Sequence, residues 1–325
     1  MGLFVFFSSL PHALATELVI YSARKEHLVK ALFDDYEKET GVKIKYLTGK
    51  AAALMQRLKA EGKNTPADLL ITVDAGNLWH AVREGLLRPV DSLALNANIP
   101  AHLRDQEGRW FGLSIRARTI VYNTDKLKSA DLKSYKDLAD GKWKNRLLLR
   151  TSKKVYNQSL VAMLIAEHGS DKAAEIVKGW VANLAAPPFS NDTKVMEAIA
   201  AGLGDVGIVN TYYFGRLIKK NPDLPLALFW AGQEGNGTHV NVSGAGVTTH
   251  AKNPKEAIKF LEWLSSERAQ NLFADVNMEY PVNQKNIPHP TVQAWGEFKQ
   301  NKMPLWMAGA LQGKAIMLMD KAGYK

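Results

Sequence analysis

The chain has 325 residues, of which 46% are hydrophobic and 23% are charged. These fractions are ordinary for a folded water-soluble protein, so they exclude gross disorder and a fibrous repeat. The length suits two domains of about 150 residues each or one large α/β unit, and either can bury a sizeable core.

The formal net charge is +10, from 42 Lys and Arg against 32 Asp and Glu. A basic balance is compatible with nucleic acid or an anionic surface as a partner, so the distribution of charge decides. Basic and acidic residues share the same segments, as at Lys25-Glu26 and along 172–178, and the longest basic run is two residues. This pattern is typical of solvated helix faces, so we expect no nucleic-acid partner.

The chain contains no cysteine. This excludes thiol catalysis, cysteine-based zinc sites, iron–sulfur clusters and disulfides. It also excludes a membrane anchor made by a lipid on cysteine.

The first fifteen residues have the pattern of a cleavable signal peptide. An apolar run over 3–10 is followed by Pro11 and by Ala13-Leu14-Ala15, which match an h-region and an A-x-A cleavage site. Met1-Gly2 carries no basic residue, and a buried N-terminal strand is the alternative. The run is too short for a transmembrane helix. We therefore expect residues 1–15 to be a signal peptide, removed on export to the periplasm, and no insertion of the mature chain into the membrane.

The first hundred residues alternate between strand and helix patterns, and glycines end two of the helices. The expected strands are 18–22, 42–47 and 68–73, and the expected helices are 25–40, a helix that turns Leu54 and Leu58 inward, and a helix from the N-cap Asp74 to Glu84. Strands and helices at this spacing predict βαβ units and a mostly parallel sheet.

The rest of the chain contains two long extended segments and a second α/β series. The extended segments are 110–123, which carries Arg116 and Arg118, and the glycine-rich 240–249. The other expected strands are 146–150 and 206–210, and the other expected helices are 156–168, 171–184, 193–201, 212–220, 254–273 and 303–322.

Two α/β modules joined by extended crossings predict two lobes. This layout is typical of proteins that close about a hinge on a ligand held between the lobes. We expect residues 16–115 and 243–285 to form one lobe, and residues 116–242 and 286–325 to form the other.

Motifs of the common enzyme classes are absent. The sequence has no G-x-S-x-G elbow, no Walker A loop, no H-E-x-x-H and no glycine fingerprint after a strand. The eight His show no metal-ligand spacing. We therefore expect no enzymatic activity.

Tyrosines occur at three expected strand ends. Tyr212 and Tyr213 lie where a strand gives way to a helix, Tyr156 lies at a similar place, and Tyr21 is at the carboxyl end of the first strand. Ligands of open α/β sheets bind outside the carboxyl ends of strands, so these side chains can face one crevice. The alternative is ordinary packing of half-buried tyrosines.

A cluster of phenols favours a hard, highly charged cation. A tyrosine hydroxyl has a pKa near 10, so a phenolate at neutral pH requires strong positive charge beside it. A trivalent metal supplies this charge, and oxygen donors without cysteine or many histidines disfavour copper and zinc. The pattern therefore indicates a ferric site.

Two arginines share helical spacing with these tyrosines. Arg216 lies four residues after Tyr212, and Arg24 lies three after Tyr21. Their guanidinium groups are candidates to stabilise phenolates by hydrogen bonds or to hold a companion anion such as carbonate. Ordinary surface charges are the alternative.

A set of short motifs, taken in order, resembles a known family. The motifs are Tyr21-Ser-Ala-Arg24, Gly49-Lys50-Ala51, Arg57-Leu-Lys-Ala-Glu-Gly62, Pro66-Ala-Asp-Leu69, Trp110-Phe-Gly112, Arg116-Ala-Arg118, Trp143-Lys-Asn-Arg146, Tyr156-Asn-Gln-Ser-Leu160, Asn210-Thr-Tyr-Tyr213, Gly237-Thr-His-Val-Asn-Val-Ser-Gly244 and Glu279-Tyr-Pro281. Together they resemble the periplasmic ferric-binding proteins of iron ABC importers, in particular the Fut-type branch. The resemblance covers about residues 17–325.

The resemblance implies an α/β, transferrin-like fold of the periplasmic binding proteins, with hinge strands and a ligand cleft between two lobes. It also implies a monomer that captures Fe(III) and delivers it to an inner-membrane ABC permease. The metal ligands of that branch match Tyr21, Tyr156, Tyr212 and Tyr213.

Other positions of that family are matched in part. Arg116 and Arg216 match arginines that contact the ligands or an anion. Many relatives have a His before the first ligand tyrosine, where this chain has Ile20, so water, carbonate or an open face neutralised by arginine are candidates for the remaining positions. Asp74 matches an acidic site position of another branch, but we interpret it as a helix N-cap.

Two further hypotheses remain. The same scaffold can bind an organic anion or a polyamine, with arginines as the clamp and tyrosines as stacking walls. A ferric site should give a visible phenolate-to-iron band, whereas an anion binder stays colourless. An exported hydrolase is the other hypothesis, but no Ser/His/Asp constellation supports it.

Overall fold

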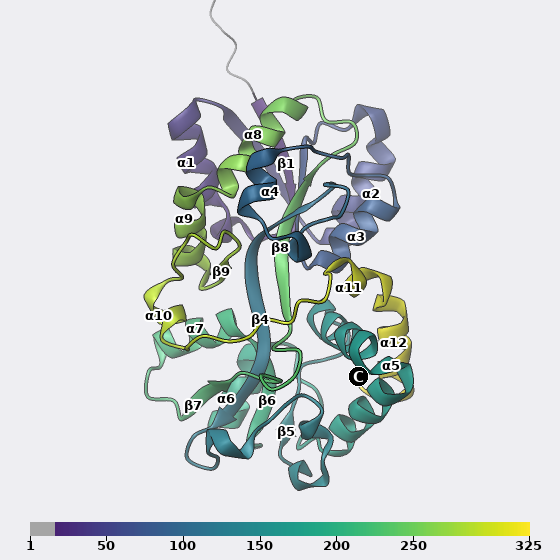
Figure 1. Ribbon diagram of the computed structural model, residues 1–325, viewed down its shortest axis with the longest axis vertical. Helices are drawn as coiled ribbons and strands as arrows, with labels where there is room; N and C mark the ends of the chain where they lie inside the picture. The colour runs from purple at the N-terminus through teal and green to yellow at the C-terminus, as the bar shows by residue number, and fades with distance from the viewer. Residues whose placement is uncertain (1–16) are drawn as a thin grey trace, which may run out of the picture.

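The computed structural model describes residues 17–325, except for the side chains of residues 274 and 275, and Figure 1 shows its elements. The predicted signal peptide, residues 1–15, lies outside the described residues. The strands are β1 (Glu17–Ser22), β2 (Lys43–Thr48), β3 (Leu69–Val73), β4 (Phe111–Asn123), β5 (Leu147–Leu148), β6 (Val206–Asn210), β7 (Leu226–Phe229), β8 (Val240–Val247) and β9 (Tyr280–Pro281). The helices are α1 (Lys30–Thr40), α2 (Ala51–Glu61), α3 (Ala75–Arg83), α4 (Leu93–Asn98), α5 (Val155–Ala182), α6 (Asp192–Ala200), α7 (Thr211–Lys220), α8 (Pro254–Leu264), α9 (Glu267–Asn277), α10 (Pro290–Gln293), α11 (Trp306–Ala310) and α12 (Gln312–Lys321).

The sheet is mixed, and the parallel part predicted for the first hundred residues is joined to antiparallel strands from the rest of the chain. The strand order is β2-β1-β3-β8-β4-β6-β5, with β7 and β9 paired to β4. The βαβ prediction is confirmed for β1, β2 and β3, which are parallel. The long strands β4 and β8 instead run antiparallel to their neighbours, because they carry the chain between the two halves.

Strands β4 and β8 connect the two lobes. The amino half of β4, residues 111–117, pairs with β8, whereas residues 118–122 pair with β6. Figure 1 shows both strands running through the waist of the molecule, between a half with α1, α2 and α8 and a half with α5, α6 and α7. The extended segments predicted at 110–123 and 240–249 therefore contain the crossing strands.

Separate hydrophobic cores lie on either side of this waist. One contains residues of β1, β3, α3 and α8, together with Phe111, Ile115 and Ala117 of β4. Beyond Arg118, side chains alternate between two smaller cores, with Ile120 facing α5 and Val121 facing α6 and α7. This is the two-lobed α/β architecture expected from the sequence. The residue bounds predicted for each lobe stay a prediction.

Three predicted helices are interrupted. The predicted helix 254–273 divides into α8 and α9 at Ser265, whose hydroxyl donates to the Glu262 carbonyl oxygen at 2.7 Å. The predicted helix 303–322 divides into α11 and α12 around Leu311. The first helix begins as a short 3-10 turn, Glu26–Leu28, and becomes α-helical at Lys30. Amphipathic spacing continues through such breaks, so the pattern cannot locate them.

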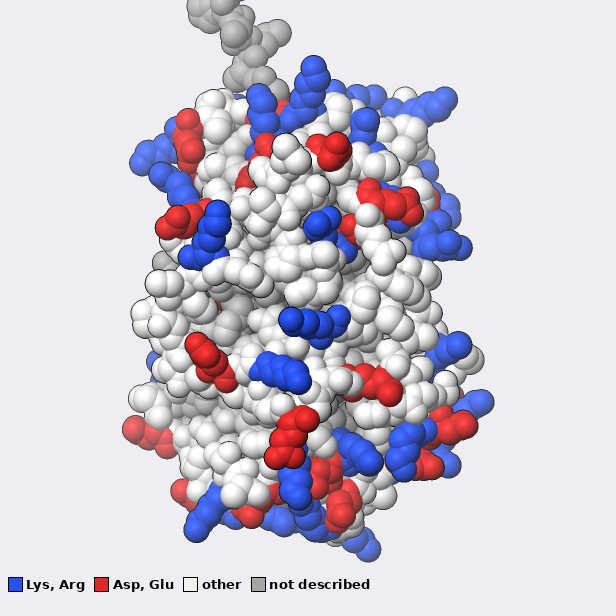
Figure 2. Space-filling model, in the orientation of Figure 1, with Lys and Arg blue, Asp and Glu red and all other residues white. Residues whose placement is uncertain are grey.

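Basic and acidic side chains are interspersed on the face shown in Figure 2, without a continuous basic stripe. The scattered charges therefore agree with the sequence pattern on this face. Within residues 17–325, no helix combines the length and the apolar character needed to cross a membrane.

Candidate functional site

Three of the predicted tyrosines lie in the first turn of a helix. Tyr212 and Tyr213 occupy the first turn of α7, directly after β6, and Tyr156 occupies the first turn of α5. Tyr21 lies within β1, paired with Leu47 and Leu70 on the neighbouring strands.

A buried arginine, Arg118 on β4, holds two of these junctions in place. Its guanidinium donates to Asp192 Oδ2 at 3.0 Å and to Asn210 Oδ1 at 3.1 Å, at the start of α7. Its Nε donates to Asn157 Oδ1 at 3.0 Å, next to Tyr156 on α5. Because these contacts are charge-assisted and buried, they fix α5 and α7 relative to each other.

Tyr156, Tyr212 and Tyr213 share one cluster with arginines. The Tyr212 and Tyr213 rings lie 4.5 Å apart between their centres. The guanidinium carbon of Arg150 is 5.1 Å from the centre of the Tyr156 ring and 5.7 Å from that of Tyr213. Arg150 therefore connects Tyr156 to the tyrosine pair.

Two of the predicted arginines contact this cluster. The guanidinium carbon of Arg116 lies 5.2 Å from the centre of the Tyr156 ring, and that of Arg216 lies 5.0 Å from that of Tyr212. Arg116 also donates to Ser243 Oγ at 2.9 Å and to the Val242 carbonyl oxygen at 3.0 Å, but its buried Nε has no partner among the described atoms. Rings flanked by guanidinium groups favour loss of a phenol proton when a cation arrives.

The electrostatics of the cluster are balanced between opposing effects. Burial raises the pKa of Tyr212 well above 10, the nearby Tyr156 and Tyr213 phenols raise it further, and Arg116 lowers it. Burial alone would lower the pKa of Arg116, but Tyr156, Tyr212 and Glu279 raise it above its ordinary value. Without a further positive charge, Tyr212 stays protonated at neutral pH.

Tyr21 has different partners. Its hydroxyl donates to Glu61 of α2, at 2.8 Å from Oε1 and 3.0 Å from Oε2, and Arg57 of the same helix lies over its ring. Burial, followed by the Glu61 carboxylate, raises the pKa of Tyr21. The described contacts of this side chain are within the first lobe and do not reach the other three tyrosines.

Arg24 is also engaged elsewhere. It forms a two-pronged ion pair with Glu279, at 3.1 and 3.2 Å, and donates to Ser243 Oγ. Burial would raise the pKa of Glu279, but Arg24 and Arg116 lower it below its ordinary 4.5. Arg24 thus neutralises a buried carboxylate, and it meets Arg116 through their shared partner Ser243.

Two buried residues of the site, Arg150 and Asp192, were not among those predicted from the sequence. Arg150 is 5% exposed, its Nη1 lies 3.5 Å from Asp192 Oδ1, and its Nε has no hydrogen-bond partner among the described atoms. The same rule that selected the tyrosines would have found it, because Arg150 lies at the carboxyl end of the predicted strand 146–150. Asp192 has no such signal. It is the first residue of α6, far from Arg118 and Arg150 in the sequence, and only the fold brings it beside them.

Asp74 lies beside the cluster, at a small cavity. As predicted, it is the N-cap of α3, and its Oδ1 accepts from the Gly76 amide at 2.9 Å. The cavity has a volume of about 10 Å³, room for about one water molecule, and is lined by Asp74, Arg116, Arg118, Tyr156, Asn210, His239 and Asn241. Burial, with Arg118 and Arg116, lowers the pKa of His239 to about 3, so its ring is neutral.

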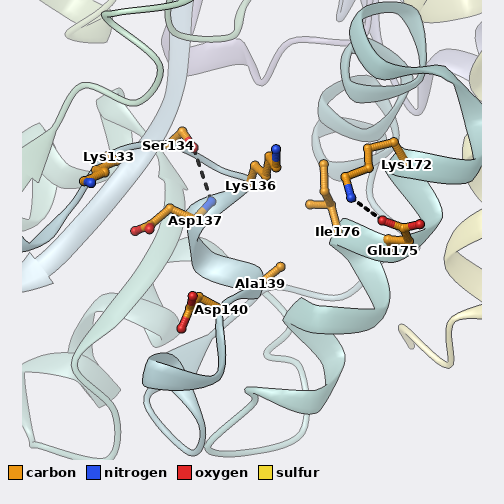
Figure 3. A pocket seen from close by; sticks show the side chains of 9 residues that line it. All are labelled: Lys133, Ser134, Lys136, Asp137, Ala139, Asp140, Lys172, Glu175 and Ile176. Carbon is orange, nitrogen blue, oxygen red and sulfur yellow. Dashed lines mark hydrogen bonds and ion pairs between the residues drawn. The ribbon is translucent and has the colours of Figure 1, made fainter.

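Larger hollows lie away from the tyrosines. One, of about 480 Å³, lies between the 133–140 segment and the carboxyl half of α5 (Figure 3). Of the charged side chains that line it, Lys172 pairs with Glu175, and Asp137 pairs with Lys142. Among residues 17–325, no group of three or more His, Cys, Asp or Glu side chains is placed to hold a metal ion. The phenol–arginine cluster is therefore the best candidate site.

Known proteins are similar to this chain in sequence and in fold. Residues 31–300 match the family of bacterial extracellular solute-binding proteins. The chain belongs to this family. The solute-binding protein is 42% identical to iron uptake protein A1 of Synechocystis over 315 residues, which cover 95% of this chain and 88% of that protein.

Solved structures support the same assignment. The Trichodesmium protein IdiA (FutA), solved in complex with iron and citrate, matches with a TM-score of 0.92 and 43% identity, over 95% of this chain and 100% of that one. Ferric iron-binding protein A of Mannheimia haemolytica, in an open conformation, matches with a TM-score of 0.89 and 34% identity, over 95% and 99%. The solute-binding protein thus lies in the branch of ferric-binding proteins, and the family resemblance and the fold drawn from the sequence are confirmed.

Proposed function

We propose that this solute-binding protein binds Fe(III) as its cargo through the phenolates of Tyr156, Tyr212 and Tyr213. The observation that carries the proposal is the convergence of these three rings on Arg116, Arg150 and Arg216. Phenolate oxygen is a hard donor suited to a ferric ion, and the nearby guanidinium groups favour ionisation of the phenols.

The charge balance favours a trivalent ion. Three phenolates carry three negative charges, and the buried cluster keeps Tyr212 protonated until a strong cation is present. Binding therefore exchanges phenol protons for the metal. Carbonate or water is proposed to complete the coordination, with the unpartnered Nε atoms of Arg116 and Arg150 as available donors for an anion.

Tyr21 was the fourth metal ligand predicted from the sequence, and its part in the site stays a prediction. Its hydroxyl would have to leave Glu61 to join a metal held by the other lobe. The described contacts favour a structural role for Tyr21 and a site built from one lobe's tyrosines.

We further propose that the protein works in the periplasm as a monomer, without catalytic turnover, and delivers iron to an inner-membrane ABC permease. The names of its relatives, which are iron-uptake and ferric-binding proteins, support this role. Reduction of the bound ion would lower its charge and its preference for phenolate, which gives a route to release.

An organic anion is the second candidate cargo. Relatives at 28% identity are named as putative 2-aminoethylphosphonate-binding proteins, and the buried arginines would suit an anion. However, Glu279 already pairs with Arg24 and Asp192 with Arg150, which leaves less positive charge for an anion.

Titration of the metal-free protein with ferric citrate distinguishes the two. We expect a visible phenolate-to-iron band that saturates at one iron per chain, and its loss in Tyr156→Phe. A colourless wild-type protein that retains citrate or a phosphonate would contradict the proposal.

A further inference from the structure

Asp74 adopts a backbone conformation that a simple helix cap does not require. Its φ is +78°, in a region that residues other than glycine rarely occupy, and its side chain is fully buried. A serine or asparagine with ordinary backbone angles can cap a helix equally well. The strained placement therefore points to a second task for the carboxylate.

The second carboxylate oxygen contacts two other elements. Oδ1 accepts from Gly76 within α3, while Oδ2 accepts from Ser159 Oγ of α5 at 2.7 Å and from Asn241 Nδ2 of β8 at 2.9 Å. Asn241 in turn accepts from the amide of Ala75 at 2.9 Å. One buried carboxylate thus joins a helix of each lobe to a crossing strand.

Ser159 lies on the helix that carries Tyr156. The two residues are three apart on α5, so they occupy adjacent turns of one face. Ser159 is followed by Leu160 and Val161, which belong to the core beside α5, whereas Asp74 is followed by Ala75 of the first core. The bond between Ser159 and Asp74 therefore crosses between two cores.

A second set of hydrogen bonds links the same two helices, α5 and α3. Gln158 Oε1 accepts from Gln312 Nε2 of α12 at 2.8 Å, and Gln312 Oε1 lies 2.6 Å from His80 Nε2 of α3. Neighbouring residues of α5 are thus linked to α3 directly and through α12. In Figure 1, α11 and α12 run along the side where α3 and α5 approach each other.

We propose that Asp74 is a positioning residue for the ligand site, whose carboxylate holds the first turns of α5, and with them Tyr156, against the amino end of α3. This inference rests on the proposed function, because it assigns Tyr156 to the metal. Asp74 itself does not bind the ion. It sets the position of one phenol relative to the first lobe and so governs how firmly the cargo is retained.

Ser159→Ala tests this role without altering Asp74 or a tyrosine. We expect the ferric band to persist with a shifted maximum, and iron transfer to a competing chelator to accelerate about tenfold, the effect of losing one buried hydrogen bond to a charged group. Asp74→Asn, which places an amide group opposite the Asn241 amide, should accelerate release further. In the double variant, release should match that of Asp74→Asn alone, because both substitutions break the same tie.

Ser129→Ala, which changes an exposed serine of a short 3-10 turn, is the matched control and should behave as wild type. A purely structural role for Asp74 would lower the melting temperature but leave the band and the release rate of Ser159→Ala within twofold of wild type, which would overturn the inference. An increase in the release rate of the double variant equal to the product of the two single increases would overturn it as well. A wild-type protein that gives no band would instead refute the proposed function.

Discussion

Tyr21 and Tyr212 follow the same sequence rule and meet opposite surroundings. Both lie at the carboxyl end of a strand, yet the Tyr21 hydroxyl donates to Glu61, whereas the Tyr212 ring faces Arg216 and lies tilted against the Tyr213 ring. A carboxylate neighbour favours the protonated phenol, and guanidinium neighbours favour the phenolate. Both rings lie beside a guanidinium group, so it is the carboxylate partner of the Tyr21 hydroxyl that separates the structural tyrosine from the candidate ligand.

This difference also assigns roles to the two lobes. The tyrosines of the second lobe share arginines from β4, the 146–150 strand region and α7. The first lobe contributes Asp74, which accepts from Ser159 of α5, and Ser243, which accepts from Arg116. We interpret the second lobe as the source of ligands and the first lobe as the surface that holds them in place.

The largest expected effect is the loss of a phenol from the cluster. Tyr212→Phe should weaken iron binding by more than about a hundredfold, beyond the range typical of residues that only orient a ligand. Tyr122→Phe, at a buried tyrosine of β4 outside the cluster, is the control and should retain the wild-type affinity. Equal iron affinities for these two variants, measured by competition with a chelator, would remove the distinction between the two kinds of tyrosine.

Iron affinity should fall as the pH falls. Because burial and the neighbouring phenols raise the pKa of Tyr212, the free protein holds that proton at neutral pH, and binding releases it. Each proton released contributes up to about tenfold in affinity per pH unit. Tyr21→Phe should show the same slope as wild type, since the Tyr21 hydroxyl of the wild-type protein keeps its proton and its hydrogen bond to Glu61 when iron binds.

Chelator competition between about pH 6 and 8, corrected for protonation of the chelator, measures this slope. A flat profile would mean that the phenols do not exchange protons for the metal. A shallower slope in Tyr21→Phe would bring that tyrosine into the ligand set.

Arg150→Gln should weaken iron binding about ten- to a hundredfold, because Arg150 lies between the Tyr156 and Tyr213 rings. The band should remain, at a shifted wavelength, since all three phenols are kept. Arg146→Gln, at a half-exposed arginine paired with Asp205 in the same segment, is the matched control. An affinity of Arg150→Gln equal to that of this control would show that Arg150 has no part in the site.

The smallest effect is expected for Tyr21→Phe. The change removes a hydrogen bond to Glu61 and should lower the free energy of unfolding by about 1 kcal/mol, with iron affinity within about threefold of wild type. Thermal unfolding and chelator competition on one preparation measure both quantities. Loss of the visible band would restore the four-tyrosine site predicted from the sequence.

The sequence predicted features that depend on neighbouring residues. The β6–α7 junction with Tyr212 and Tyr213, the crossing strands and the Asp74 cap all follow from local spacing, strand ends and capping chemistry. The motifs taken together also led to the correct family. These features need no knowledge of which distant segments meet.

Features that depend on contacts between residues far apart in the chain were harder to predict from the sequence. Glu61 is 40 residues from Tyr21, and the Ser159–Asp74 bond spans 85 residues, so neither contact leaves a local pattern. The antiparallel crossings were also hard to predict, since β4 and β8 are buried on both faces and lack the alternation typical of an antiparallel strand with one face in water. Arg150 was accessible in principle, but no pattern within its own strand distinguishes it from a surface arginine.

An iron-loaded crystal structure with anomalous scattering at the iron edge tests the central claim most directly. We predict one peak within coordination distance of the hydroxyl oxygens of Tyr156, Tyr212 and Tyr213, with the Tyr21 hydroxyl still on Glu61. A peak remote from these three oxygens, or one with Tyr21 as its main protein ligand, would contradict it.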